Sequence, residues 1–403
     1  MKLRGHPGAH LAYCLNVHRG ESWAEQLAAV RGPGAEVRCR VAPDAPFALG
    51  LRLSDRASRD LEAVRDDGPR IREELGGLGF YVLTINAFPF GAFHGRRVKE
   101  LVYAPDWRSP ERLAYTLRVA DAAAALAPAG GGSVSLSTVP GTYKAWIRGD
   151  EDREAMVRNL ATAAAHLHGI EAAGGARLHL GLEPEPDCFL ETTDECCAFF
   201  PDLVERGGAW LAARQGWSKP GAEAAIRRHI GVCVDTCHLA VEFEDPTDAV
   251  RRLSAAGILI SKVQLSAAPV CGAADAAALA AFDDPVYLHQ VKVRGADGRV
   301  RGYADLGEAL AAHARSGDGE WRVHVHVPLY WDGAGTAMRS TAETIAPAFF
   351  DAALGAGVEH FEIETYTFDV LPEALRRDGV VASIAREYEW VLARVTPRAI
   401  PGS

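Results

Sequence analysis

Hydrophobic and polar residues alternate along the chain with two different periods. Short segments in which every second side chain is apolar are separated by longer stretches with helical periodicity. Such an alternation predicts repeated βα units and a parallel sheet. The nine segments predicted as strands are Ala12–His18, Ala48–Ser54, Tyr81–Asn86, Ser133–Thr138, Leu178–Glu183, Gly231–Asp235, Ile258–Ser266, Arg322–Val327 and Phe361–Thr367.

The predicted strands have one apolar and one polar face. In the segment 178–183, for example, three leucines alternate with His179, Gly181 and Glu183. An open doubly wound sheet needs almost continuously apolar strands, because helices cover both of its faces. A closed barrel accepts polar inward residues near the carboxyl ends of its strands, where catalysis takes place. The pattern therefore predicts a TIM (β/α)8 barrel, and no glycine-rich nucleotide-binding motif follows the first strand.

Helix starts between these strands agree with that prediction. Serine or aspartate is a preferred N-cap, and proline fits the first helical turn. The predicted helices begin at Ser22, Ser54, Ser109-Pro110, Asp152, Asp245-Pro246 and Thr341.

A barrel has room for eight strands, so one of the nine segments is surplus. Either 322–327 or the neighbouring 286–293 lies outside the barrel. The region from Ala267 to Trp331 is too long for a simple βα loop. Its Asp297-Gly298 pair predicts a β-hairpin, which we expect as an insertion near residues 285–305 after the seventh strand. Residues 1–403 are otherwise expected to form a single domain.

Composition narrows the class of protein. The 403 residues are 48% hydrophobic and 24% charged, as in ordinary globular proteins, and the net charge of −10 argues against nucleic-acid binding. We expect no membrane span and no secretory leader, because the sequence lacks an apolar run of ~18 residues and a leader-like start. The eight cysteines form no CxxC pair, which favours reduced thiols and a cytoplasmic location.

Polar residues end four consecutive predicted strands. Glu183 ends the fifth strand, and Asp235 and His238 lie at the end of the sixth. Gln264 lies in the seventh strand and Glu364 in the eighth. In a barrel these side chains would converge on one mouth. Carboxylates with an imidazole suit a divalent ion such as Mg, Mn, Co, Fe(II) or Zn. The alternative is that the acids cap helices or pair with cations.

Further polar residues are candidates for substrate binding. His324 and His326 share a face of one predicted strand, His289 lies in the nearby hairpin, and Asn86 ends the third strand. Lys262 either binds substrate or forms a buried ion pair with an acid such as Glu362. The loop from Phe88 to Glu100 combines aromatic residues with cations and includes His94, so it is either a lid or an ordinary packed loop.

The order Glu183, Asp235-x-x-His238, a strand-seven residue and Glu364 resembles the xylose isomerase-like TIM barrels. This resemblance implies metal ligands at Glu183, Asp235, Gln264 and Glu364, with His238 contacting substrate. The superfamily has His where this chain has Gln264, so either His326 supplies the imidazole or metal binding has been lost.

Longer motifs are similar to those of the EboE family. They include HLAYCLNVHRGESW, LEPEPDCFLETT, GVCVDTCHLAVEFEDP and EIETYTFDVLP. That family is described as a metabolite traffic protein of a bacterial gene cluster, which implies a secondary-metabolite pathway and other cluster proteins as partners.

Two functions remain open from the sequence. The first is a metal-dependent isomerase or epimerase of a small polyhydroxylated metabolite, in which Glu183 or Glu364 moves a carbon-bound proton and His238 orients a hydroxyl. The second is a non-catalytic protein that binds a metabolite in the barrel mouth. DNA repair of the endonuclease IV kind is disfavoured by the charge of −10.

Overall fold

A computed structural model provides the structure of the chain. It describes residues 1–92, 98–129, 132–313, 319–333 and 335–395.

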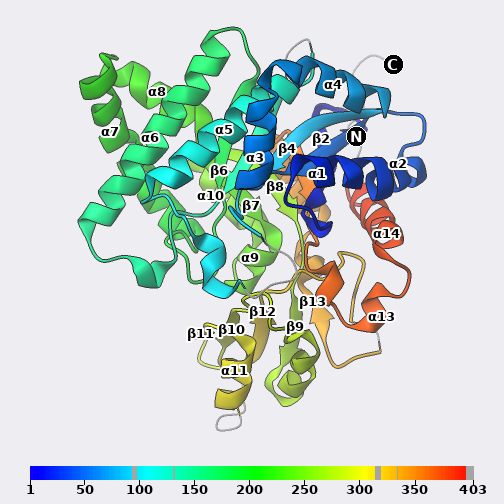
Figure 1. The fold of residues 1–403 in the computed structure, drawn as a ribbon. Coiled ribbons are helices and arrows are strands. Elements are labelled where there is room, and N and C mark those ends of the chain that lie inside the picture. Colours follow the sequence, from blue (N-terminus) through cyan, green and yellow to red (C-terminus); the bar gives the residue numbers. More distant parts are fainter. Residues whose placement is uncertain (93–97, 130–131, 314–318, 334, 396–403) are drawn as a thin grey trace.

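Within these residues, eight parallel strands close into a barrel surrounded by helices (Figure 1). The sheet order β2-β14-β8-β7-β6-β5-β4-β3 returns to β2 through the β2–β3 pairing, and β1 (Lys2–Leu3) adds to β2 in antiparallel orientation. The predicted TIM barrel is confirmed. The barrel strands are β2 (His6–Cys14), β3 (Phe47–Arg52), β4 (Phe80–Asn86), β5 (Ser133–Thr138), β6 (Arg177–Leu182), β7 (Ile230–Asp235), β8 (Leu259–Leu265) and β14 (His360–Ile363).

Helices connect the strands on the outside of the barrel. The α-helices are α1 (Trp23–Ala29), α2 (Ala35–Val41), α3 (Asp55–Ala63), α4 (Gly68–Gly77), α5 (Pro110–Leu126), α6 (Asp150–Ala172), α7 (Thr193–Gln215), α8 (Lys219–His229), α9 (Thr236–Val241), α10 (Pro246–Ala255), α11 (Leu306–His313), α12 (Pro347–Gly355), α13 (Glu373–Arg376) and α14 (Val380–Leu392). Shorter helical turns are η1 (Leu15–Val17), η2 (Val30–Gly34), η3 (Arg65–Asp67), η4 (Lys99–Tyr103), η5 (Lys144–Trp146), η6 (Ala273–Phe282), η7 (Thr341–Thr344) and η8 (Phe368–Val370).

The predicted helix starts are mostly confirmed. Ser22 accepts a hydrogen bond from the backbone N–H of Glu25 in a complete capping box, and Ser54, Ser109 and Asp245 also cap their helices. The start at Thr341 was wrong, because a 3-10 turn forms there and the α-helix begins only at Pro347.

The sequence predicted which segments form strands better than it predicted where each strand ends. β2 stops at Cys14 and β14 at Ile363, where the sequence pattern continued to His18 and Thr367. In both places the alternation of apolar and polar residues continues beyond the strand. The periodicity of the sequence therefore could not show where the hydrogen bonding between strands ends.

The two faces of the strands have the predicted roles. The outward leucines and valines, such as Leu178, Leu180 and Leu182, are fully buried against the helices and form the main hydrophobic core. Most inward positions are polar or small, apart from a small apolar cluster that includes Ala12, Ala48 and Leu83. The barrel interior is therefore lined by side chains that must hydrogen-bond or pair with one another.

The surplus segment belongs to a second sheet between β8 and β14 (Figure 1). Its antiparallel order is β11-β10-β12-β9-β13. The predicted hairpin is confirmed as β10 and β11, but the insertion is larger than predicted and extends from residue 269 to 340. Its strands are β9 (Pro269–Gly272), β10 (Val291–Arg294), β11 (Val300–Tyr303), β12 (Glu320–Val323) and β13 (Arg339–Ser340).

A buried ion pair crosses the barrel interior. Lys262 and Glu362 are both fully buried and pair with each other, and Thr84 donates a hydrogen bond of 2.5 Å to Glu362. Burial alone would lower the pKa of Lys262, but the Glu362 carboxylate outweighs it and the pKa is raised, so the lysine keeps its charge. A Cβ on Gly50 would lie 1.7 Å from Oε1 of Glu362, which explains the glycine.

Helix α14 holds two segments that leave the barrel mouth. Oε1 of Glu387 accepts hydrogen bonds from the backbone N–H of Leu329 at 3.1 Å and from the Thr365 hydroxyl at 2.7 Å. Burial raises the pKa of Glu387 to about 7, although the hydrogen bond from Thr365 lowers it.

Replacing Lys262 by methionine leaves Glu362 buried without its cation. Loss of one partner of a buried pair typically costs about 3–5 kcal/mol, so we expect K262M to lower the free energy of unfolding by that amount. Urea denaturation measures it. The double variant K262M/E362Q should recover most of the loss; an unchanged K262M protein would contradict the pairing.

Glu387 should make stability fall as the pH rises. Its folded pKa of about 7 exceeds the ordinary value of 4.5, so between these values the native state binds more protons than the unfolded state and stability declines with pH. Between pH 5 and pH 8 we expect the free energy of unfolding of E387Q to fall by about 2.5 kcal/mol less than that of the wild type. Parallel wild-type and E387Q curves in chemical denaturation would refute the assignment.

Candidate functional site

The four residues predicted at strand ends lie together at the carboxyl end of the barrel. Glu183 directly follows β6, Asp235 ends β7, Gln264 lies one residue before the end of β8, and Glu364 directly follows β14. All are buried, with at most 4% of each residue exposed. The structure therefore brings these four side chains together, as predicted. The chemical roles of the four residues remain predictions.

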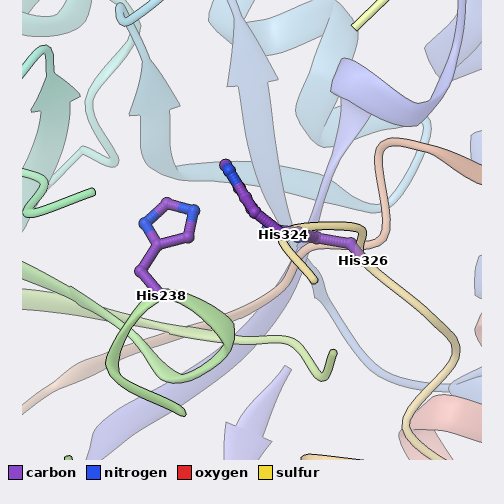
Figure 2. Close-up of side chains that lie close together, drawn as sticks. All are labelled: His238, His324 and His326. Carbon is purple, nitrogen blue, oxygen red and sulfur yellow. The ribbon is translucent and has the colours of Figure 1, made fainter. Parts of the chain in front are cut away.

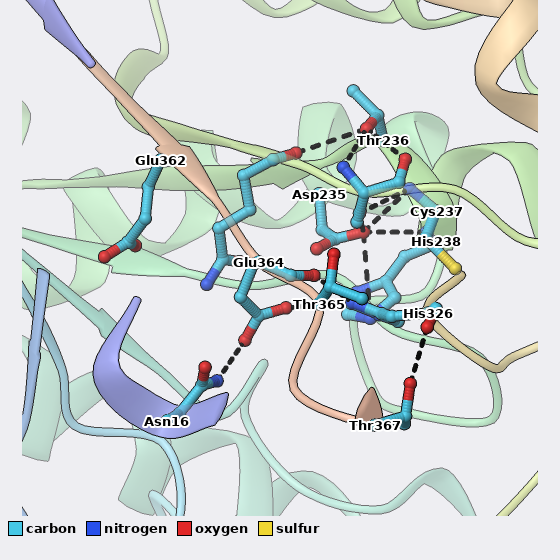
Figure 3. Close-up of polar contacts among 12 residues, drawn as sticks. Asn16, Asp235, Thr236, Cys237, His238, His326, Glu362, Glu364, Thr365 and Thr367 are labelled. Atoms are coloured by element: carbon cyan, nitrogen blue, oxygen red, sulfur yellow. Dashed lines mark hydrogen bonds and ion pairs between the residues drawn. The ribbon is translucent and has the colours of Figure 1, made fainter. Parts of the chain in front are cut away.

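The local sequence explains how Asp235 and His238 share the mouth. Asp235 is the N-cap of α9, and its Oδ1 accepts hydrogen bonds from the backbone N–H groups of Cys237 at 2.8 Å and His238 at 3.0 Å. Ser266 also donates to Oδ1, at 2.7 Å (Asp235 is shown in Figure 3). Oδ2 of Asp235 is buried and has no partner among the described residues. One carboxylate oxygen thus fixes the turn while the other is left for a ligand.

His324 and His326 are brought to the same mouth by the returning end of the insertion. They follow β12 instead of lying on it, so their predicted place on a strand was wrong. Beyond them, Val327 donates a backbone hydrogen bond of 2.8 Å to Ala267, at the point where the insertion leaves the barrel. Thr367 donates to the carbonyl of His326 at 2.6 Å (Figure 3).

Three imidazoles therefore face one another (Figure 2). The ring centroids of His238 and His324 are 4.6 Å apart, those of His238 and His326 5.4 Å, and those of His324 and His326 5.5 Å. Burial lowers the pKa of His238 to about 4 and that of His324 well below its usual value, with the neighbouring imidazoles adding to the effect. Neither of these two rings carries a charge at neutral pH. For His326, burial lowers the pKa, but the neighbouring Cys237 and Asp235 outweigh it and raise the pKa well above its usual value.

Glu183 is held by Gln264. In the amide orientation that satisfies both side chains, Nε2 of Gln264 donates to Oε1 of Glu183 at 2.8 Å and to Oε2 at 3.1 Å. Burial, followed by the charges of Glu364 and Asp235, raises the pKa of Glu183 well above its usual value. Gln264 thus offers hydrogens to a carboxylate, which differs from the ligand role that the resemblance implied for it.

Glu364 is held from the opposite side. Asn16 donates to its Oε1 at 2.5 Å (Figure 3), and its Oε2 lies 3.1 Å from Nδ1 of His326. Burial raises the pKa of Glu364, although His326 lowers it.

Groups of donor atoms within 4.8 Å of one another indicate where an ion could bind. Within the described part of the chain they are His238, His324 and His326; Asp235, Cys237 and His326; and Glu183, Asp235 and His238. Glu364 belongs to none of these three groups. The donor set includes both imidazole nitrogens and carboxylate oxygens, which fits a divalent transition ion better than an all-oxygen set would.

A small cavity of about 50 Å³ opens above these groups. Its floor includes Asn86, Glu183, His238, His324 and Glu364. Its walls are largely aromatic and aliphatic, formed by Phe88, Pro89, Val98, Val102, Tyr103, Tyr287, Leu288 and Tyr366.

Other predicted binding residues lie elsewhere. Lys262 is the ion-pair partner of Glu362 and does not line this cavity. His289 pairs with Asp284, and its Nδ1 lies 3.2 Å from the carbonyl oxygen of His324. His289 thus contacts the backbone of the segment that carries His324 and His326. His94 lies outside the described residues. Of the cations predicted in its loop, Lys99 lines the cavity and forms an ion pair of 2.6 Å with Asp305.

One network at the cavity edge was missed by sequence reasoning. Tyr103 donates to Oε1 of Glu185 at 2.8 Å, Gln290 donates to the Tyr103 hydroxyl at 2.9 Å, and Nδ1 of His324 donates to Oε1 of Gln290 at 2.7 Å. Burial raises the pKa of Glu185 to about 8, against the effect of the Tyr103 hydrogen bond. Tyr103 and Gln290 lie outside the barrel strands. In such segments the sequence has no periodicity from which the direction of a side chain could be predicted.

No protein-family model matches the chain, and no curated protein matches it closely enough to count as a relative. Among the described residues, no helix combines the length and apolar character needed to cross a membrane.

Several solved structures resemble the chain. A xylose isomerase-like TIM barrel protein from Mycobacterium smegmatis, in complex with magnesium, is 13% identical over 96% of this chain and 95% of that chain, with a TM-score of 0.48. A xylose isomerase domain protein from Planctomyces limnophilus is 13% identical over 98% and 97%, with a TM-score of 0.47. An L-ribulose 3-epimerase is 14% identical over 96% and 93%, with a TM-score of 0.47.

The contact between Gln264 and Glu183 predicts a coupled effect on stability. Q264L removes both donors from a buried carboxylate, and an unsatisfied buried group costs about 1–3 kcal/mol, so we expect a loss of that size. E183Q/Q264L should lose less than the sum of the two single variants, as measured by urea denaturation in a double-mutant cycle. Strictly additive losses would show that the two side chains do not interact.

Proposed function

We propose that the protein is a divalent-metal-dependent isomerase or epimerase of a small polyhydroxylated metabolite. The observation that carries the proposal is the set of buried ligand atoms at the barrel mouth. Oδ2 of Asp235 and Nε2 of His324 and His326 lack any partner among the described residues. Buried polar atoms normally find a hydrogen-bond partner, so several unpaired ones in one place indicate a ligand that the site is built to receive.

The residues at the mouth fit a divalent ion of the Mn, Mg, Co, Fe or Zn type. Asp235 and His326 are our first choices as ligands; each belongs to two of the three donor groups, as does His238. His326 thus takes the place of the imidazole that the xylose isomerase-like pattern expects at strand seven. Glu183 belongs to one donor group, whereas Gln264 acts on Glu183 and is the weakest of the proposed ligands. A bound ion would polarise a substrate carbonyl and stabilise the adjoining oxygen.

Proton movement falls to Glu183 and Glu364. Each carboxylate is oriented by a neutral amide, from Gln264 and Asn16 respectively, and Glu364 also lies 3.1 Å from Nδ1 of His326. A positioned carboxylate can take a proton from a carbon next to a carbonyl and return it. His238 lines the cavity floor beside them and would orient a substrate hydroxyl. Asn86 and His324, also on the floor, are proposed to contact the substrate.

The pathway is a further part of the proposal. We assign the metabolite to a secondary-metabolite pathway, with other proteins of the same gene cluster as partners. The motifs similar to those of the EboE family support this assignment. All eight cysteines are free, which favours a reducing compartment such as the cytoplasm. We also treat the barrel and its insertion as one domain, because residues of both line the cavity.

A non-catalytic binding protein is the second candidate. The observation in its favour is Gln264, whose amide is engaged by Glu183 where an imidazole ligand would be expected. In that case the cavity would hold a metabolite without moving a proton.

Proton exchange distinguishes the two functions. The metal-loaded protein is incubated in deuterated water with a panel of aldoses, ketoses and cyclitol ketones, and NMR follows deuterium entering at carbon. We expect exchange in the wild type, and a loss of about 100- to 10,000-fold in E183Q and E364Q, because each removes a proton-transferring carboxylate. E359Q is the matched control: Glu359 is exposed and lies just before β14, at the opposite end of the barrel from Glu364.

Ligand binding without any exchange, equally strong in the wild type and both glutamine variants, would contradict the isomerase and support the binding protein.

A further inference from the structure

The three imidazoles at the mouth come from two different parts of the fold. His238 lies in α9, directly after barrel strand β7, whereas His324 and His326 lie on the returning end of the insertion (Figure 2). All three are buried, with at most 4% exposed. One ring nitrogen of each lies within 4.8 Å of a ring nitrogen of each of the other two.

Hydrogen bonds fix which nitrogen each ring presents. Nδ1 of His238 lies 2.9 Å from the carbonyl oxygen of Pro184, Nδ1 of His326 lies 2.7 Å from that of Glu364, and Nδ1 of His324 lies 2.7 Å from Oε1 of Gln290. Each of these partner oxygens can only accept, so each Nδ1 carries the hydrogen. The lone pair is therefore on Nε2, which is how metal-binding histidines are commonly held.

The Nε2 atoms make few contacts within the protein. Those of His324 and His326 have no hydrogen-bond partner among the described residues, although Cys237 lies close to His326. Nε2 of His238 lies 3.9 Å from Oδ1 of Asp235, too far for a hydrogen bond, and that oxygen already accepts three hydrogen bonds. A purely structural cluster of histidines would be expected to use these atoms in hydrogen bonds within the protein.

The spacing of the rings fits a shared ion. Three imidazoles on one tetrahedral ion, at metal–nitrogen distances of ~2.1 Å, place their ring centroids ~5 Å apart. The measured separations are 4.6, 5.4 and 5.5 Å. Imidazole nitrogens favour zinc, iron, cobalt and related ions, whereas magnesium and calcium prefer oxygen.

We propose that His238, His324 and His326 together bind one transition-metal ion through their Nε2 atoms, with Asp235 as the neighbouring carboxylate. This inference deepens the proposed function, on which it rests for the use of the site. It names the ion class and the ligands, and it assigns His238 and His324 to the ion instead of the substrate. It leaves Glu183 and Glu364 for the substrate. It also makes the ion a link between the barrel and the insertion, since one ligand comes from the first and two from the second.

Metal titration of the full-length protein tests the proposal without requiring turnover. Chelator-treated protein is titrated with Zn²⁺ and with Mg²⁺ against a chromophoric competitor, and with Co²⁺ while its visible absorption is recorded. We expect one equivalent of Zn²⁺, bound at least about 1,000-fold more tightly than Mg²⁺. H324A should weaken Zn²⁺ binding by about 100-fold or more and change the Co²⁺ spectrum, because one nitrogen leaves the ion. H324Q, which keeps more of the side-chain volume, serves if H324A folds poorly.

H166A is the control, because His166 lies on α6 and pairs with Asp121 on the outside of the barrel. It should bind both ions like the wild type. Wild-type Zn²⁺ affinity and Co²⁺ spectrum in both His324 variants, or equal affinity for Zn²⁺ and Mg²⁺, would overturn the proposal.

The variants E183Q and E364Q distinguish the three-imidazole metal site from the proposed isomerase activity. E183Q and E364Q should keep Zn²⁺ affinity within about tenfold, since the three imidazoles remain, while losing proton exchange. Absence of exchange in a protein that binds Zn²⁺ through His324 would defeat the isomerase alone. Exchange that persists in H324A with wild-type Zn²⁺ affinity would defeat the three-imidazole site alone.

Discussion

The backbone pairing of Ala267 with Val327 is the constraint on which the site depends. Between these residues the chain leaves the barrel after β8, forms most of an antiparallel sheet and returns to the point where it left. The hydrogen bond from Val327 to Ala267 fixes the return, so His324 and His326 come to lie over the mouth. Glu387 holds the next turn through Leu329, and Thr367 holds the carbonyl of His326. The insertion is thus part of the site.

Below the mouth, a buried ion pair crosses the barrel interior. Lys262 and Glu362 neutralise each other, and Gly50 leaves the space that the carboxylate needs. Above this pair, Gln264 and Asn16 each donate a hydrogen bond to one glutamate. Oδ2 of Asp235 and Nε2 of His324 and His326, which have no partner among the described residues, lie at the carboxyl end of the barrel, where TIM barrels place their active sites. These unpaired ligand atoms are the physical basis for proposing a function at the mouth.

The sequence predicted the barrel because a period of two is a direct consequence of strand geometry. For β5 it predicted even the bounds, Ser133–Thr138. It also predicted that Glu183, Asp235, Gln264 and Glu364 would converge, since carboxyl ends of parallel strands meet at one mouth. It did not predict that His324 and His326 would leave their strand, because that depends on pairing between residues 60 positions apart. The contact of Gln264 with Glu183 and the network of Tyr103 and Gln290 depend on side-chain directions that no pattern encodes.

The central claim is that the returning end of the insertion supplies ligands to an ion at the barrel mouth. X-ray absorption spectroscopy of the zinc-loaded protein tests it most directly, because scattering from the outer atoms of imidazole rings counts the histidines on the ion. We predict three imidazoles in the wild type and two in H324A. A shell made only of carboxylate and water oxygens, unchanged in H324A, would contradict the account.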